Sequence, residues 1–189
     1  MELSQIDLAI LLPAFAAAWN LAGGNKTIAV PRRSTRPYRA PDGSFSLEVP
    51  EGWEHRVEEA GGEVTFLHGE VSVNVSVAQA EDGDAIDQCL EINKALLRHL
   101  CPTAEIWAEG TTMLSGATGA YFTMYCPGPR VRTVVRISAA LCRNQLIVFK
   151  FALPSAELYA AQTVLDRMVQ SLKVNEGQTA GREPRRRAC

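Results

Sequence analysis

The chain has 189 residues, of which 47% are hydrophobic and 21% are charged, a length and composition typical of one soluble globular domain. The net charge of −2 is unevenly distributed, since residues 1–41 carry +3 and residues 175–189 carry +2, which leaves −7 for residues 42–174. An acidic body with sparse basic ends repels phosphate groups, so a nucleic-acid partner is excluded.

Residues 1–23 form a hydrophobic N-terminal segment, with an uncharged apolar run from Leu8 to Trp19. That run is shorter than the roughly 18 residues that a membrane span needs. It resembles the apolar part of an export signal, but Glu2 and Asp7 precede it and no basic residue does. An export signal, a docked hydrophobic helix and a mis-assigned start codon all stay open. Membrane contact is expected only through this segment.

Residues 24–41 and 175–189 flank the predicted domain. The first stretch has three prolines, no periodicity and several arginines, which predicts a basic, extended linker. Its arginines are expected in solvent or against an anionic surface; they are Arg32, Arg33, Arg36 and Arg39. The second stretch lacks apolar periodicity, which predicts a disordered basic tail.

The predicted domain, residues 42–174, opens with the stretch from Ser44 to Trp53. Phe45, Leu47 and Val49 alternate with polar residues, the period-2 pattern of a strand with one buried face. Pro50 ends the pairing because it has no N–H to donate. We expect Trp53 to return to the core and cover the end of the sheet.

Most of the remaining domain also follows a strand pattern. Residues 63–68 and 71–78 alternate and are separated by two residues, which predicts a hairpin and hence an antiparallel sheet. Four more strands are predicted at 105–113, 117–125, 131–142 and 145–153, with short turns between them.

Two amphipathic helices are predicted beside these strands. The first begins at Asp84, a favourable N-cap, and runs to about Leu100, while the second runs from Ala156 to about Val174. Each carries an apolar stripe that must be buried against the sheet. The fold class is therefore α+β, with an antiparallel sheet of about six to seven strands flanked by two helices.

The order of these elements resembles that of a known fold family. The opening Phe45-x-Leu47-x-x-Pro50-x-Gly52-Trp53, the valine-rich hairpin, the long helix, the four strands and the closing helix with Met168-x-x-Ser171-Leu172 look like the Mog1/PsbP-like α/β/α sandwich. The resemblance covers about 130 residues. Many bacterial proteins of unknown function share the same pattern. It implies a role in binding rather than catalysis, because the eukaryotic members act as a Ran-interacting factor and as photosystem II subunits.

No constellation of residues in the chain predicts catalysis. His55, His68 and His99 are the three histidines, and none has the spacing of a metal site. Cys126 sits in a predicted hairpin turn, without the neighbouring base or helix N-terminus that activates a thiol. We therefore predict no catalytic residue, no cofactor and no metal ligand.

Five cysteines, an odd number without a C-x-x-C pair, predict free thiols; they are Cys89, Cys101, Cys126, Cys142 and Cys189. Free thiols favour a cytoplasmic location, with export through the N-terminal segment as the alternative.

The chain is thus predicted to be a non-catalytic interaction or accessory protein that binds a protein partner. The alternative is a small-ligand-binding protein or cryptic enzyme with a pocket between sheet and helix. Neither the partner-binding residues nor the oligomeric state follows from the sequence.

Overall fold

The computed structural model describes residues 34–57, 63–80, 85–128 and 131–175. The expectations for residues 1–33, for the cap at Asp84 and for the tail beyond Asn175 lie outside this part of the chain.

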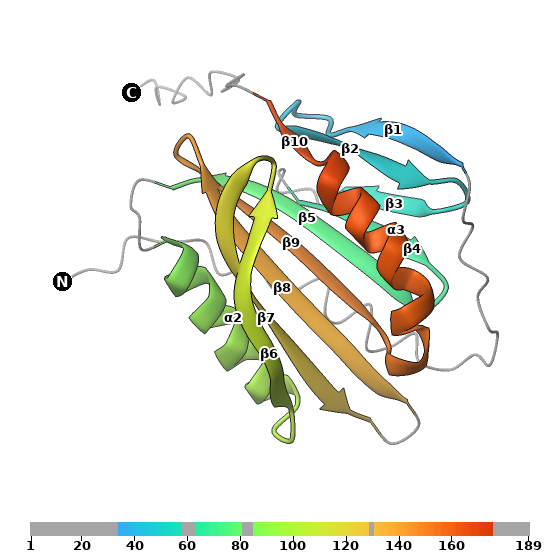
Figure 1. Ribbon diagram of the computed structural model, residues 1–189, viewed down its shortest axis with the longest axis vertical. Coiled ribbons are helices and arrows are strands. Elements are labelled where there is room, and N and C mark those ends of the chain that lie inside the picture. Colours follow the sequence, from blue (N-terminus) through green and yellow to red (C-terminus); the bar gives the residue numbers. More distant parts are fainter. Residues whose placement is uncertain (1–33, 58–62, 81–84, 129–130, 176–189) are drawn as a thin grey trace, which may run out of the picture.

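A seven-stranded antiparallel sheet forms the centre of the molecule (Figure 1). Its strands, in spatial order, are β3 (Glu54–Val57), β4 (Glu63–His68), β5 (Val71–Gln79), β9 (Gln145–Pro154), β8 (Arg132–Cys142), β7 (Ala117–Pro127) and β6 (Glu105–Leu114). The sheet consists of two runs of strands that are neighbours both in the chain and in space: β3 to β5, and β6 to β9. The two runs meet where β5 pairs with β9, and in this pairing Asn74 lies opposite Lys150. Between the two runs, the chain passes through helix α2 (Ala85–Leu100).

A separate three-stranded sheet contains β1 (Thr35–Arg39), β2 (Phe45–Pro50) and β10 (Lys173–Val174). Strand β1 falls within residues 24–41, which we predicted from the sequence to be a linker. Pro37 is compatible with β1 because this strand lies at an edge, where one side makes no ladder hydrogen bonds. The smaller sheet is a feature that alternation did not predict.

The two faces of the large sheet are covered by different elements. On one face, α3 (Leu158–Ser171) and the smaller sheet enclose a core that includes Phe45, Phe66 and Phe149. On the opposite face, α2 encloses a second core that includes Phe122 and Met124. Successive residues of a strand point to opposite faces, so β9 contributes to both cores. This is the predicted α+β sandwich.

Several expectations from the sequence are confirmed. Trp53 is buried in the first core, and the hairpin of β4 and β5 forms at Gly69. Helix α3 is shorter than expected, because a 3-10 turn at Ser155–Glu157 precedes it and β10 follows it. Strand β3 was not predicted, since its residues are all exposed and show no alternation.

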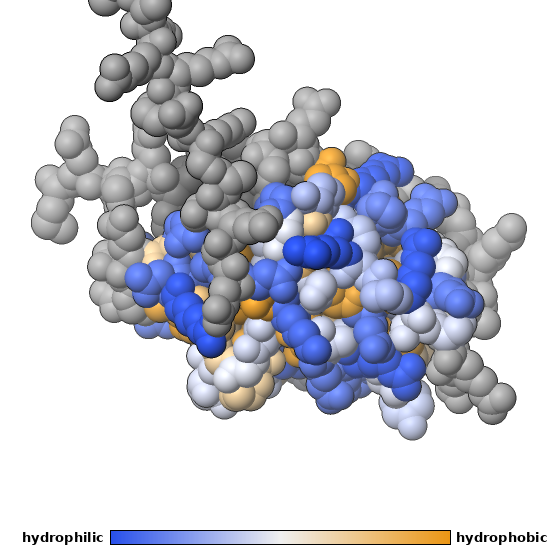
Figure 2. Space-filling model, turned by 90° about the horizontal axis from the view of Figure 1, so that it is seen from above, coloured by the Kyte–Doolittle hydropathy of each residue, from blue (hydrophilic) through white to orange (hydrophobic). Residues whose placement is uncertain are grey.

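Neither described helix has the length and apolarity of a membrane span. On the face shown in Figure 2, hydrophilic residues predominate and apolar residues show only in small areas between them. An extended apolar surface is therefore absent from the described part of that face.

Candidate interaction site at the edge of the large sheet

Strand β6 forms one edge of the large sheet and carries exposed apolar side chains. It is ten residues long, and its outer side pairs with no other described strand. Trp107 is 57% exposed and Met113 is 55% exposed, while Ile106 is also exposed. Large apolar side chains at a free sheet edge are unusual, because such edges invite pairing with another chain.

A β-bulge explains the position of Trp107. Ile106 lies opposite Met124 and Ala108 lies opposite Thr123, which leaves Trp107 without a residue opposite it. Its ring lies against Tyr125, with 4.9 Å between ring centroids. The bulge therefore turns Trp107 toward the face of the sheet that Tyr125 occupies, which is the face opposite α2.

Tyr121 extends this arrangement of rings along β7. The guanidinium carbon of Arg136 lies 3.7 Å from the centroid of the Tyr121 ring, within the range of a cation–π interaction. On β6, Gly110 lies opposite Tyr121, and a Cβ at Gly110 would be 3.2 Å from the ring. We call Trp107, Tyr121, Tyr125, Arg132 and Arg136 the aromatic surface.

A cavity of about 440 Å³ opens at the start of β6. A second cavity, of about 470 Å³, lies beside α3 and is described below. The first cavity is lined by Thr103, Glu105, Tyr125, Pro127, Arg132 and Ser155. Tyr125 and Arg132 therefore belong both to this cavity and to the aromatic surface. The cavity has the size of a small-ligand site and could also receive a side chain of a partner.

Helix α2 supports β6 from the opposite face through Lys94. The Lys94 ammonium contacts Glu91 at 2.7 Å and Glu109 of β6 at 2.6 Å. The hydrogen bond that Lys94 donates to Glu109, followed by the one it donates to Glu91, raises the pKa of Lys94. The charge of Glu109 is thus balanced within the molecule.

The other sheet edges are short, charged or interrupted by proline. Strand β3, the opposite edge of the large sheet, has four residues and carries Glu54 and Arg56. Strand β1 contains Pro37, and β10 has two residues. These are features with which proteins protect edge strands, and β6 has none of them between residues 108 and 113 apart from Glu109.

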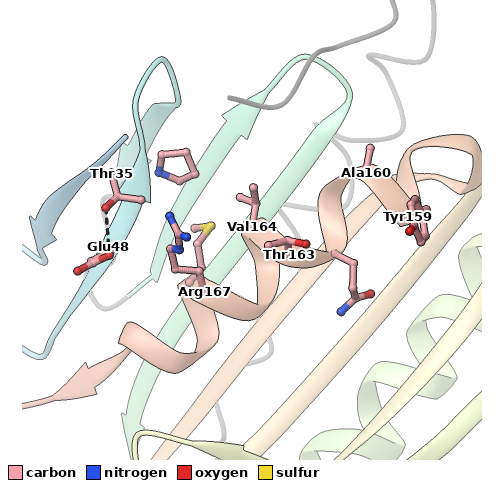
Figure 3. Close-up of a pocket in the computed structure, with 10 residues that line it drawn as sticks. Thr35, Glu48, Tyr159, Ala160, Thr163, Val164 and Arg167 are labelled. Atoms are coloured by element: carbon pink, nitrogen blue, oxygen red, sulfur yellow. Dashed lines mark hydrogen bonds between the residues drawn. The ribbon is translucent and has the colours of Figure 1, made fainter. Parts of the chain in front are cut away.

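The cavity of about 470 Å³ is a groove between α3 and the strands β1 and β2 (Figure 3). Val164 and Met168 form apolar parts of its lining. Arg167 extends from α3 toward the side where Thr35 donates a hydrogen bond to Glu48, at 3.0 Å. This groove lies between a helix and a sheet, as the alternative function requires.

Two of the histidines, His55 and His68, lie on the paired strands β3 and β4, and His99 lies at the end of α2. His68 stacks on Trp53 with 5.7 Å between centroids, His55 is exposed on β3, and His99 is exposed at the end of α2. No histidine lines either of the two cavities described above. Within the described residues, no group of three or more potential ligands could hold a metal ion.

The cysteines within the described residues are free, and three of them are buried: Cys89, Cys101 and Cys126. Burial, together with the neighbouring Cys101, raises the pKa of Cys126 to about 12. A thiol with this pKa is protonated at neutral pH and is a poor nucleophile.

A buried polar group crosses the sheet on the α2 face. Lys150 is 3% exposed, and its Nζ has no hydrogen-bond partner among the described residues. Asn74, opposite it on β5, donates hydrogen bonds to Glu63 at 2.5 Å and to Thr65 at 3.1 Å. Burial lowers the pKa of Lys150, against the opposing influence of Glu63.

Sequence reasoning missed both the aromatic surface and this polar group. Trp107, Tyr121 and Tyr125 lie in predicted strands, but a strand pattern does not tell which strand is at an edge. The weak alternation of 105–113 was the one available signal. Similarly, the alternation of 71–78 does not tell that Ser72 and Asn74 are buried as well as the valines between them.

No family model matches this sequence, and neither does any curated protein. Several solved structures are similar to it. Cyanobacterial PsbP from Synechocystis is 14% identical with a TM-score of 0.56, covering 80% of this chain and 96% of its own. The Ran-binding protein Mog1p of Saccharomyces cerevisiae is 13% identical with a TM-score of 0.56, covering 76% and 96%.

A third similar structure is LpqN, involved in cell envelope biogenesis of Mycobacterium tuberculosis. It is 11% identical with a TM-score of 0.50, and the match covers 75% of this chain and 91% of that one. At these identities, the similarities establish the fold.

Proposed function

We propose that this chain, which has the Mog1/PsbP-like fold, is a non-catalytic interaction protein that binds a protein partner at β6 and the aromatic surface. The observation that carries the proposal is the exposed Trp107 beside a long sheet edge that pairs with no other described strand.

The composition of the aromatic surface supports a protein partner. Tryptophan, tyrosine and arginine are the residues that most often dominate binding energy at protein interfaces. Trp107 and Tyr125 contact each other, as do Tyr121 and Arg136, and these contacts restrict the side chains before a partner binds. Ordered side chains lose less conformational entropy when a partner arrives. Mog1p, one of the similar structures, is a Ran-binding protein, which supports a protein as the kind of partner.

The chemistry of the described residues gives less support to an enzyme. General acid–base catalysis needs titratable groups positioned together at a site, and no histidine lines either of the two cavities described above. Lys150 has a lowered pKa but lines neither of the two cavities described above. Binding a protein partner requires no such group of titratable residues, and the aromatic surface provides the contacts it needs.

The charge of the domain bears on the partner's composition. Residues 42–174 carry a charge of −7, which attracts a basic partner at long range. We therefore expect the association to weaken as salt rises, since exposed charges are screened over about 8 Å at physiological ionic strength.

Affinity capture with matched variants tests this proposal. The wild-type chain, Trp107→Ala and Val57→Ala are each immobilised and exposed to a lysate of the source cells. Val57 is a suitable control because it is an exposed apolar residue on the opposite edge strand. We expect a protein that the wild type and Val57→Ala retain and Trp107→Ala does not. Equal recovery by all three chains would contradict the proposed surface.

The α3 groove is the basis of the second candidate function, the binding of a small ligand. Its volume is within the range of small-molecule sites, and Arg167 makes no ion pair with another described residue. A thermal-shift screen of small carboxylates with the wild type and Arg167→Gln discriminates the two functions. Stabilisation that Arg167→Gln removes and Trp107→Ala retains would favour the groove.

A further inference from the structure

We infer that the partner binds as an added strand: an extended segment pairs with residues 108–113 of β6 and places a β-branched or aromatic side chain beside Gly110. The inference rests on the proposed function and specifies how the partner is recognised.

The backbone of β6 has the geometry that strand addition requires. Beyond the bulge at Trp107, each residue from Ala108 to Leu114 lies opposite one residue of β7 in an unbroken antiparallel register. In such a ladder, alternate residues direct their N–H and C=O groups toward the outer side. No described strand accepts or donates there. A peptide that pairs with these groups gains main-chain hydrogen bonds along its length.

The side chains of this segment leave the outer edge accessible. It contains no proline and no lysine, and Thr111 and Thr112 are β-branched residues that suit a strand. Its single charged side chain, Glu109, is paired with Lys94 of α2. Proteins commonly block an edge with a lysine, a proline or a short strand, and β3 and β1 show these devices in the same molecule.

Gly110 indicates which side chain the added strand would carry. The glycine has no side chain to cover the edge of the Tyr121 ring, which lies 3.2 Å from the position of a Cβ. A large side chain on the added strand, directly opposite Gly110, would contact that ring. Cross-strand pairs between an aromatic and a β-branched or aromatic residue stabilise sheets.

A second copy of the chain is the competing occupant of this edge. Antiparallel self-pairing centred on Gly110 would place two glycines opposite each other, and centring on Glu109 would place two carboxylates opposite each other, both of which weaken a sheet. Self-pairing centred on Thr111 would avoid both arrangements and place Thr112 opposite Gly110. Self-association is therefore measured alongside peptide binding.

Selection from a displayed library of random decapeptides on the full chain provides a probe. The strongest selected peptide is synthesised, and its binding is measured by calorimetry and by amide exchange in NMR spectra. We expect slowed exchange at alternate residues of 108–113. We also expect that N-methylation of alternate peptide residues weakens binding about tenfold or more, because each methyl group removes a main-chain hydrogen bond.

Two proline variants on β6 test the direction of the backbone groups. Adjacent residues direct their N–H groups to opposite sides, so one of Thr111→Pro and Thr112→Pro removes an outward N–H and the other an inward one. We expect the outward variant to fold with nearly unchanged Tm and to lose the peptide, while the inward variant loses stability. His55→Pro on β3 serves as the control for a proline at the other edge.

The outcomes separate this inference from the proposed function. If Trp107→Ala abolishes binding while N-methylated peptides bind as tightly as the parent, strand addition is wrong and the aromatic surface still holds. If the selected peptide binds Trp107→Ala unchanged while N-methylation still weakens binding, the aromatic surface is wrong and strand addition holds. If neither N-methylation nor Trp107→Ala weakens binding, both proposals fail. Self-association measured by sedimentation that Thr111→Pro or Thr112→Pro disrupts would identify a second copy as the occupant and overturn the inference.

Discussion

The two edges of the large sheet, β3 and β6, differ in nearly every property that governs edge pairing. Strand β3 has four residues, all exposed, and carries Glu54 and Arg56. Strand β6 has ten residues, carries Trp107 and Met113 at 57% and 55% exposure, and has its one charge within 108–113 paired internally. Because a long edge with exposed apolar side chains promotes aggregation unless it is used, this contrast is the basis for our proposal that β6 serves binding.

The largest expected effect concerns Trp107. Trp107→Ala should weaken binding of the selected peptide by about 2 kcal/mol, roughly 30-fold, because exposed tryptophans at interfaces are frequent hot spots. Val57→Ala, at the other edge, should change binding less than about twofold. Calorimetric titration measures both. Similar losses from the two variants would remove the distinction between the edges.

A second prediction separates the interior of the sheet from its edge. The double variant Glu63→Gln with Lys150→Met removes two buried charges from the central strands and keeps an amide that can accept from Asn74. Replacing buried charges with neutral groups is often stabilising, by about 1–4 kcal/mol. Urea denaturation at pH 7 should show this gain. Peptide binding should be unchanged, because neither residue belongs to β6.

The pH dependence of the same variant follows from the lowered pKa of Lys150. In the window between its lowered folded pKa and the unfolded value of about 10.4, the unfolded chain binds more protons, so wild-type stability rises with pH. The gain in unfolding free energy of the double variant over the wild type should therefore shrink as pH increases from 7 toward 10.5. An advantage that stays constant over this range would show that burial of the ammonium has no energetic cost.

Thiol labelling tests whether the start of β6 is as well ordered as the core on the α2 face. Cys101 and Cys126 are buried in that core, while Cys142 is only partly buried. Of the four cysteines in the described residues, Cys142 should react first in the native protein, and the unfolded, unreduced protein should show five free thiols. A bridge, if found, should join Cys101 and Cys126, because these two thiols are neighbours. Fast labelling of Cys126 would indicate a loosely held edge.

The smallest effect is expected from Lys94, which links α2 to β6. The pKa of Lys94 is higher in the folded protein than in the unfolded chain. Its contribution to stability is therefore fully present below the pKa in the unfolded chain, and it is lost as pH rises through the pKa in the folded protein. Lys94→Met should slightly speed amide exchange in β6 below pH 10 and leave β3 unaffected. Because ion pairs with exposed carboxylates contribute little, a large loss of stability would contradict this role.

The fold was accessible from the sequence where side chains alternate or follow helical spacing. Strands β2 and β5 and both helices were predicted because one face of each is apolar. Strand β1 was missed since Pro37 and its arginines read as a linker, and β3 because its residues are all exposed.

The site was not accessible in the same way. Which strand lies at an edge depends on the pairing of β5 with β9, two segments about 70 residues apart that no local pattern connects. The ring contact between Trp107 and Tyr125 depends on a bulge, which a sequence pattern does not show. Exposure of Trp107 therefore became visible only in the folded chain.

The central claim is that β6, and not another part of the surface, receives the partner. Hydrogen exchange of the full chain with and without the selected peptide, resolved by residue, tests it most directly. We predict protection confined to residues 105–114 and the adjoining part of β7, with no change in β3 or at the α3 groove. Protection at α3 and β1, with β6 unchanged, would contradict the claim.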